Sequence, residues 1–89
     1  MINKFYVYML ISYNNNKFTT YVGYTNNIKK RLILHNTSKG AKFTKGKNWK
    51  VIYKRCYDTK SVALKNEFLL KRNKIKRKEI KDKYIDNLK

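Results

Sequence analysis

The chain has 89 residues, of which 23 are Lys or Arg and only five are Asp or Glu, so its formal net charge is +18. This length suits one small domain, and the hydrophobic fraction of 42% is too high for a disordered chain. The single cysteine excludes an internal disulfide, and no apolar run is long enough to span a membrane.

The N-terminus, "MINKFYVYML", has a short apolar stretch and no small-residue cleavage site. These features argue against a signal peptide, and a lone cysteine suits a reducing compartment. We therefore expect an intracellular protein, either cytoplasmic or located at the nucleoid or nucleus, that is not secreted and does not bind membranes.

The strong positive charge predicts a polyanionic partner, most simply nucleic acid, bound with salt-sensitive affinity. An AT-rich coding sequence offers another origin, since Lys outnumbers Arg 19 to 4 and Asn is frequent. Glu codons are also AT-rich, however, and the chain has only two Glu. Coding bias therefore accounts for extra Lys and leaves the scarcity of carboxylates to be explained by a partner.

The first predicted elements are two strands joined by a turn. Residues 5–12, "FYVYMLIS", are apolar on both alternating faces, as expected of a strand at the centre of a sheet. The Asn-rich residues 13–17 predict a hairpin turn, and 18–24, "FTTYVGY", predict the antiparallel return strand. Gly23 indicates a close approach to the backbone or a bulge.

A short helix is predicted over about 26–36, with Thr25 as its N-cap. Ile28 and Leu32 share one flank of this helix, and Arg31 and His35 lie on the adjoining side.

The next predicted elements are a polar loop over 37–48 and a third strand over 49–57. The loop contains two glycines and four lysines. In the strand, Val51 and Tyr53 alternate with Ile52, so we expect Val51 and Tyr53 on one face.

Two helices complete the chain. Residues 58–72 open with capping residues and predict a helix, and the basic segment of about 74–89 predicts a second one that docks weakly and frays at its end. The fold class is therefore α+β: a three-stranded antiparallel sheet flanked by helices in the order β-β-α-β-α-α, with residues 1–89 forming a single domain.

Glu67 is the most informative acidic residue, because it shares a helical stripe with Ala63 and Leu70 and so partly faces the core. A half-buried carboxylate needs a cation or a raised pKa. A salt bridge to a lysine and ligation of a divalent metal both satisfy that need, and spacing alone does not decide between them.

Four other side chains can carry chemistry. Arg31 suits a bidentate phosphate contact and His35 suits proton transfer, although an exposed Arg and a hydrogen-bonded core His are equally ordinary. Tyr8 and Tyr21, on the two predicted strands, are by themselves typical core aromatics.

The order of these residues resembles the GIY-YIG endonuclease family. The half-motifs are Tyr6-Val7-Tyr8 and Tyr21-Val22-Gly23, followed by Arg31, His35 and the later helix with Glu67. The segments "YVGYTNNIKKRLILHN", "GAKFTKGKNWKVIY" and "KSVALKNEFLLKR" are similar to small stand-alone bacterial members and to the nuclease domain of the eukaryotic structure-specific endonuclease subunit. The chain departs from the pattern at Tyr6, where the family has its first Gly.

The resemblance implies a GIY-YIG fold and a divalent-metal-dependent DNA endonuclease, structure-directed or non-specific. Glu67 would hold Mg²⁺ or Mn²⁺, and Arg31 would stabilise charge on the phosphate. Tyr21 or His35 would act as general base, with Tyr8 orienting the water. We expect these five side chains to gather in one pocket.

The expected substrate is branched, single-strand-containing or duplex DNA, cut in repair or recombination by a monomer or weak homodimer that a protein partner helps to target. Trp49 is an additional candidate for stacking on an unpaired base, or else a buried start to the third strand. Lysines flanking the site are expected to bind the DNA backbone: Lys29, Lys30, Lys39, Lys42, Lys45 and Lys47.

Two other classes remain open. One is a catalytically silent nucleic-acid-binding module, which is disfavoured by the presence of all five residues. The other is a generic basic structural protein, which predicts no convergence of the five side chains.

Overall fold

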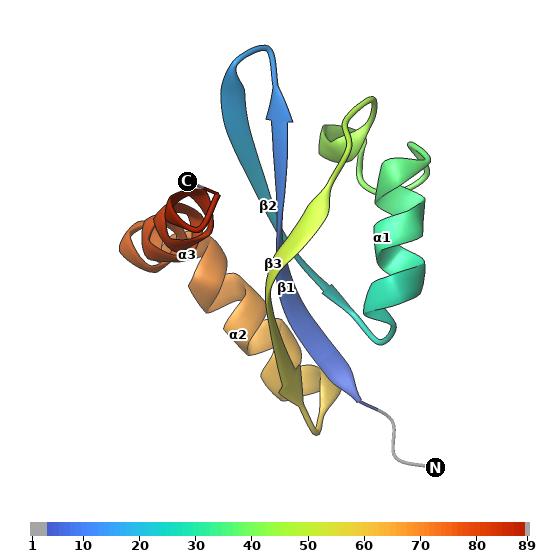
Figure 1. Cartoon of the computed structure of the whole chain (residues 1–89). Coiled ribbons are helices and arrows are strands. Elements are labelled where there is room, and N and C mark those ends of the chain that lie inside the picture. Colours follow the sequence, from blue (N-terminus) through green and yellow to red (C-terminus); the bar gives the residue numbers. More distant parts are fainter. Residues whose placement is uncertain (1–3, 89) are drawn as a thin grey trace.

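The computed structural model describes residues 4–88 and contains one antiparallel sheet between two layers of helices (Figure 1). In chain order the elements are β1 (Phe5–Asn14), β2 (Lys17–Thr25), α1 (Ile28–Asn36), the short 3-10 helix η1 (Lys42–Thr44), β3 (Lys50–Tyr57), α2 (Lys60–Arg72) and α3 (Lys74–Asp86). The strand order is β2-β1-β3. The predicted α+β class, element order and central first strand are confirmed.

A two-residue turn joins β1 to β2. Asn15 and Asn16 both have positive φ, 54° and 61°, as the favoured hairpin turns require and as Asn tolerates. Asn14 pairs with Lys17 directly before the turn, so both strands extend beyond their predicted bounds.

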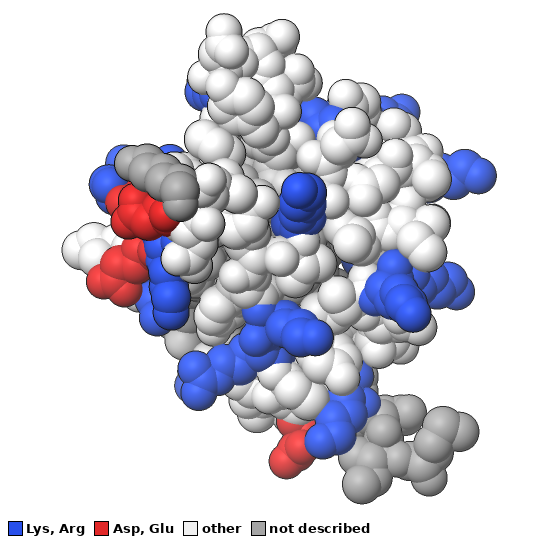
Figure 2. All heavy atoms as spheres, viewed as in Figure 1, with Lys and Arg blue, Asp and Glu red and all other residues white. Residues whose placement is uncertain are grey.

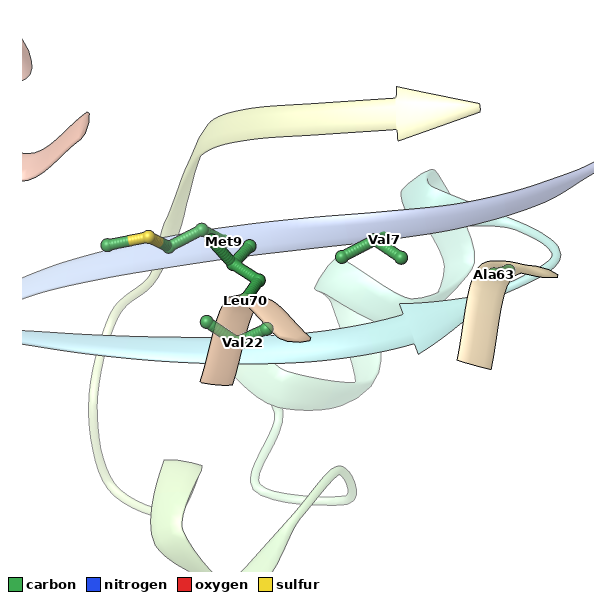
Figure 3. Packing of buried hydrophobic residues seen from close by; sticks show 5 residues of the cluster. All are labelled: Val7, Met9, Val22, Ala63 and Leu70. Atoms are coloured by element: carbon green, nitrogen blue, oxygen red, sulfur yellow. The ribbon is translucent and has the colours of Figure 1, made fainter. Parts of the chain in front are cut away.

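The central strand separates two hydrophobic clusters. Val7 and Met9 pack toward α2, together with Val22, Ala63 and Leu70 (Figure 3). On the opposite face, Tyr8 and Leu10 pack with Trp49 beneath α1. Burial on both faces explains why this strand is apolar at every position from 7 to 11.

Strand β3 contains an irregularity that breaks the predicted alternation. Met9 pairs with Tyr53 while its neighbour Leu10 pairs with Val51, so Ile52 is the extra residue. Val51 packs on the α1 side, whereas Ile52 and Tyr53 pack on the α2 side. The expectation that Val51 and Tyr53 share a face is therefore wrong.

Helix α1 begins two residues later than predicted. Its N-cap is Asn27, whose side chain accepts from the Lys30 backbone N–H at 3.1 Å. Thr25, the predicted cap, instead accepts from the Asn27 N–H at 3.1 Å and shapes the turn before the helix. The local side-chain hydrogen bond of Thr25 thus replaces its predicted capping role.

The last two helices follow the prediction closely. Thr59 caps α2 and Asn73 caps α3 through their side chains. No residue of α3 is buried, and Ile80 provides its contact with the core, which agrees with weak docking. The helix ends at Asp86, and Lys89, included in the predicted span, lies outside the described residues.

Candidate active site

Tyr8 is a buried residue of the central strand, and its phenol lies over the edge strand β2. Tyr8 lies on β1 directly opposite Gly23 of the edge strand β2, and a Cβ atom at Gly23 would collide with the phenol oxygen and with Cζ. The ring therefore lies across Gly23, where only a residue without a side chain leaves room. This confirms the close approach predicted at Gly23.

A buried hydrogen-bond chain continues from Tyr8 to the loop after α1. The Tyr8 hydroxyl lies 2.8 Å from His35 Nε2, and His35 Nδ1 lies 2.8 Å from Thr44 Oγ1. The Thr44 hydroxyl donates its single proton to the Ala41 carbonyl at 2.7 Å, so its oxygen must accept from Nδ1–H. In a neutral imidazole, Nε2 is then unprotonated and accepts from the Tyr8 hydroxyl. The chain fixes the orientation of the His35 ring, with Nε2 toward the phenol and Nδ1 toward Thr44.

The loop that supplies Thr44 is held in place by Trp49 and Asn36. The Trp49 indole N–H donates to the Thr44 carbonyl at 3.0 Å. The Asn36 side chain bonds both backbone groups of Trp49, accepting from its N–H at 2.6 Å and donating to its carbonyl at 3.2 Å. These bonds tie the end of α1 to the start of β3 and position Thr44 against the imidazole.

Arg31 lies one helical turn before His35 and acts electrostatically on the same groups. Burial lowers the pKa of His35, and the Arg31 charge lowers it further. Burial raises the pKa of Tyr8 to about 12, Arg31 opposes that rise, and Tyr21 and Glu67 add to it. Tyr8 and His35 are therefore both neutral near pH 7.

Tyr21 closes the site on the side of the loop. Its ring centroid lies 5.1 Å from that of His35, and it also stacks on Phe43, at 6.2 Å with 20° between the ring planes. The structure thus brings Tyr8, Tyr21, Arg31 and His35 together on the α1 side of the sheet.

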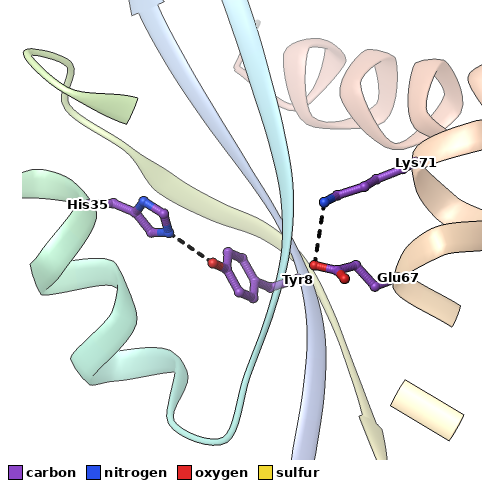
Figure 4. A network of polar contacts seen from close by, with 4 residues as sticks. All are labelled: Tyr8, His35, Glu67 and Lys71. Carbon is purple, nitrogen blue, oxygen red and sulfur yellow. Dashed lines mark hydrogen bonds and ion pairs between the residues drawn. The ribbon is translucent and has the colours of Figure 1, made fainter. Parts of the chain in front are cut away.

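Glu67 lies in the opposite layer, so the expectation that all five side chains gather in one pocket is wrong: four gather on the α1 side and Glu67 lies across the sheet from them (Figure 4). Helices α1 and α2 cover opposite faces of the sheet, and Figure 4 shows Tyr8 directed toward His35 while Glu67 and Lys71 lie beyond the strands. Glu67 is close enough to influence the pKa of Tyr8. Its side chain is 20% exposed, as the half-buried prediction requires, and its Oε2 lies 3.6 Å from Lys71 Nζ. The salt bridge left open as an alternative is present.

The donor set near the site fits a divalent cation held mainly by water and substrate oxygens. Within residues 4–88 no group of three or more His, Cys, Asp or Glu side chains is positioned to hold a metal. A lone carboxylate excludes a structural zinc site, but one or two carboxylates with waters and phosphate is the usual protein environment of Mg²⁺. Glu67 is a carboxylate of this kind, and in this structure it is paired with Lys71.

Basic side chains surround the site on the loop and helix. Figure 2 shows Lys and Arg scattered over the visible face with few acidic side chains. Of the six lysines expected to bind DNA, five are exposed, and Lys47 is half-buried with its Nζ 5.4 Å from the centroid of the Phe43 ring. Trp49 is 3% exposed, so the alternative of base stacking on Trp49 is wrong.

The sequence prediction gave no role to Thr44 or Gly40. A Cβ atom at Gly40 would collide with His35 Nδ1, so this glycine leaves space for the imidazole that Thr44 then orients. Both lie in the segment "GAKFT", where a small residue and a hydroxyl near a lone His are the only signal. The roles of these two residues can be recognised only when the structure shows that the loop folds back onto α1.

Replacing Thr44 with Val is expected to disturb the tautomer of His35, since the Nδ1–H would lose its acceptor in a buried site. Leaving a buried donor unpaired costs about 1–3 kcal/mol, so the Nε2–H form should gain population. The imidazole ¹⁵N chemical shifts report this directly, because His35 is the chain's single histidine. Thr44→Ser should restore the native shifts, and a Val variant with unchanged shifts would contradict the assignment.

The comparisons with known proteins agree with this architecture. The family model described as the GIY-YIG catalytic domain matches residues 4–81. No solved structure matches the chain significantly. Within the described residues, none of the helices combines the length and apolar character needed to cross a membrane.

The similar curated proteins are small bacterial chains. A UPF0213 protein of Bacillus licheniformis is 41% identical over 85 residues, which cover 94% of this chain and 81% of that protein. UPF0213 proteins of Streptococcus pneumoniae and Limosilactobacillus reuteri are 39% and 36% identical, covering 89% and 97% of this chain and 78% and 92% of those proteins. With a family match over nearly the whole length and relatives of similar size, the chain belongs to the GIY-YIG nuclease family.

Proposed function

We propose that the protein is a divalent-metal-dependent DNA endonuclease in which Tyr8 and His35 act together as the general base. The observation that carries this proposal is the buried chain from Tyr8 through His35 to Thr44, with both links at 2.8 Å. A neutral imidazole whose free Nε2 faces a phenol is an arrangement suited to receiving a proton.

The high pKa of Tyr8 is consistent with a relay. With a pKa of about 12, the phenol remains protonated near neutral pH and cannot remove a proton as a preformed phenolate. It can instead accept a proton from the attacking water while passing its own to Nε2 of His35. The Nδ1–H bond to Thr44 keeps the ring oriented during this transfer. Tyr21 has no hydroxyl hydrogen bond to His35 within the described residues, which favours Tyr8 as the immediate acceptor and leaves Tyr21 to orient the water.

Arg31 is suited to stabilise the phosphate as its charge increases. Its guanidinium provides paired donors for phosphate oxygens, and it lies close enough to act on both Tyr8 and His35. Removing one such preorganised donor typically costs about 3 kcal/mol of transition-state stabilisation. The positive charge of Arg31 also disfavours protonation of His35, so the imidazole remains available to accept a proton.

Glu67 is the residue proposed to hold Mg²⁺ or Mn²⁺. A cation there would supply Lewis-acid stabilisation of the phosphodiester and of the leaving 3′ oxygen. Glu67 comes from the other helical layer, and its charge is the smallest of the influences that raise the pKa of Tyr8.

DNA is the proposed substrate, bound mainly through its backbone. The net charge of +18 and the exposed lysines of α1 and the following loop favour phosphate contacts without base recognition. Cleavage should therefore depend on DNA structure, or be non-specific, and affinity should fall steeply with salt.

A panel of flaps, forks, junctions, duplexes and single strands tests this function. We expect cleavage of at least one substrate with Mg²⁺ or Mn²⁺, none in excess EDTA, and binding that weakens by orders of magnitude between low and physiological salt. Undiminished cleavage in EDTA would contradict metal dependence, and salt-independent binding would contradict backbone recognition.

A catalytically silent nucleic-acid-binding module is the second candidate. The observation that favours it is the ion pair of Glu67 with Lys71, since a carboxylate held by a lysine needs no metal. This candidate predicts salt-sensitive DNA binding with no cleavage of any panel member under either metal.

A further inference from the structure

A second pocket adjoins the candidate active site at the edge of the sheet. It has a volume of about 240 Å³ and is lined by Thr20, Tyr21, Val22, Phe43, Lys71 and Arg77. These residues come from β2, η1, α2 and α3, so the pocket lies where the two helical layers meet around the edge strand. Tyr21 belongs to both the pocket and the candidate active site, so the two sites are adjacent.

One wall of the pocket is an exposed aromatic surface. Phe43 is 53% exposed, although it lies in a loop of mostly polar residues. Its ring is nearly parallel to that of Tyr21, at a centroid distance of 6.2 Å, and Lys47 lies 5.4 Å from its centroid. A supported aromatic face with a neighbouring cation is the arrangement on which proteins stack single-stranded bases.

The opposite wall is cationic and contains an unsatisfied donor. Lys71 and Arg77 line the pocket, and the Nε atom of Arg77 is buried without a hydrogen-bond partner within the described residues. A buried N–H without an acceptor is unfavourable, and guanidinium groups bind phosphate oxygens well. Lys71 is also paired with Glu67 at 3.6 Å, so the Arg77 guanidinium is the group of this wall best suited to a phosphodiester oxygen.

We propose that this pocket binds an unpaired nucleotide of the DNA strand, with its base stacked on Phe43 and its phosphate bound by Arg77 and Lys71. The assignment to the cleaved strand rests on the proposed function, because Tyr21 connects the pocket to the catalytic groups. Duplex DNA keeps its bases stacked on one another and cannot offer a free base to Phe43. The pocket thus selects DNA with a single-stranded segment, such as a flap, fork or gap.

The test is a binding titration in EDTA, where no cleavage is required. The probes are a single-stranded oligonucleotide containing 2-aminopurine, whose fluorescence reports stacking, and a duplex of equal length. Phe43→Ala should weaken single-strand binding by roughly 5- to 100-fold and abolish the fluorescence change. Phe43→Tyr should preserve both. Duplex affinity should change by less than about twofold, since no stacked base is lost there.

Phe68→Ala is the matched control for Phe43→Ala. Phe68 is 56% exposed and has Arg72 at 5.4 Å from its ring centroid, yet it lies on α2 outside this pocket. Equal losses in the two alanine variants, no loss in either, or equal losses on single strands and duplex would overturn the proposal.

Arg77→Gln tests the phosphate contact. Arg55→Gln is its control, because it removes the same charge from β3, at the opposite edge of the sheet. Arg77→Gln should weaken single-strand binding at least threefold more than Arg55→Gln does. If the two variants weaken single-strand binding equally, the loss reflects only the lower net charge of the protein, and the proposed phosphate contact of Arg77 is overturned. Cleavage of the panel in Mg²⁺ is measured separately, so absence of activity with retained Phe43 dependence contradicts the proposed function and not this pocket.

Discussion

Glu67→Gln is expected to lower the rate of DNA cleavage in Mg²⁺ by at least roughly a hundredfold, while DNA affinity in EDTA changes by less than about twofold. A metal ion supplies several kcal/mol of transition-state stabilisation, and each 1.36 kcal/mol is about a factor of ten in rate. Gln has nearly the same shape as Glu but lacks the charge that retains the cation. Single-turnover cleavage rates and anisotropy titrations separate the two effects, and the same result is expected for Glu67→Ala.

Glu79→Gln is the matched control, because Glu79 is the chain's other glutamate and lies exposed on α3. Its replacement adds the same increment of positive charge without touching the site. If Glu67→Gln cleaves DNA as fast as Glu79→Gln does, Glu67 has no part in the mechanism. Its ion pair with Lys71 is then a structural contact only.

Tyr8→Phe is expected to reduce the cleavage rate by roughly 10²- to 10⁴-fold, the usual contribution of a positioned acid–base group. Phe preserves the packing across Gly23 but leaves Nε2 of His35 without its hydroxyl partner. The proton of the attacking water then has no path to the imidazole. Single-turnover rates across the pH range measure the loss, and DNA affinity should remain unchanged.

Tyr24→Phe provides the control for Tyr8→Phe, since Tyr24 lies on β2 and packs against the core on the α2 side. It should retain wild-type cleavage. Activity of Tyr8→Phe within tenfold of wild type, combined with a much larger loss in Tyr21→Phe, would assign the base to Tyr21 instead.

Local patterns predicted the scaffold well because short-range physics determines it. The uninterrupted apolar run of β1 requires cover on both faces, and consecutive asparagines adopt the positive φ values of a tight turn. The N-cap of α1 was misplaced because Thr25 and Asn27 are both good caps, and the choice depends on where the chain leaves β2. The irregularity at Ile52 was missed because strand register depends on the partner strand.

The candidate site was only partly predictable from the sequence. Spacing on a helix places Arg31 and His35 together, but it does not say which face of the sheet that helix covers. Tertiary packing puts α2 on the other face, so Glu67 lies across the sheet from His35 rather than alongside it (Figure 4). Thr44 was missed because its role requires the loop to fold back onto α1, a contact set by Trp49 and Asn36.

In the proposed mechanism, the cation held by Glu67 and the imidazole of His35 act on the same phosphate, although the two residues lie in opposite helical layers. Paramagnetic broadening by Mn²⁺ of the ring resonances of this single histidine measures their proximity directly. Selective broadening in the wild type and its loss in Glu67→Gln are the predicted results. Imidazole signals that remain sharp while Mn²⁺ binds elsewhere, or broadening that is identical in the two proteins, would contradict the account.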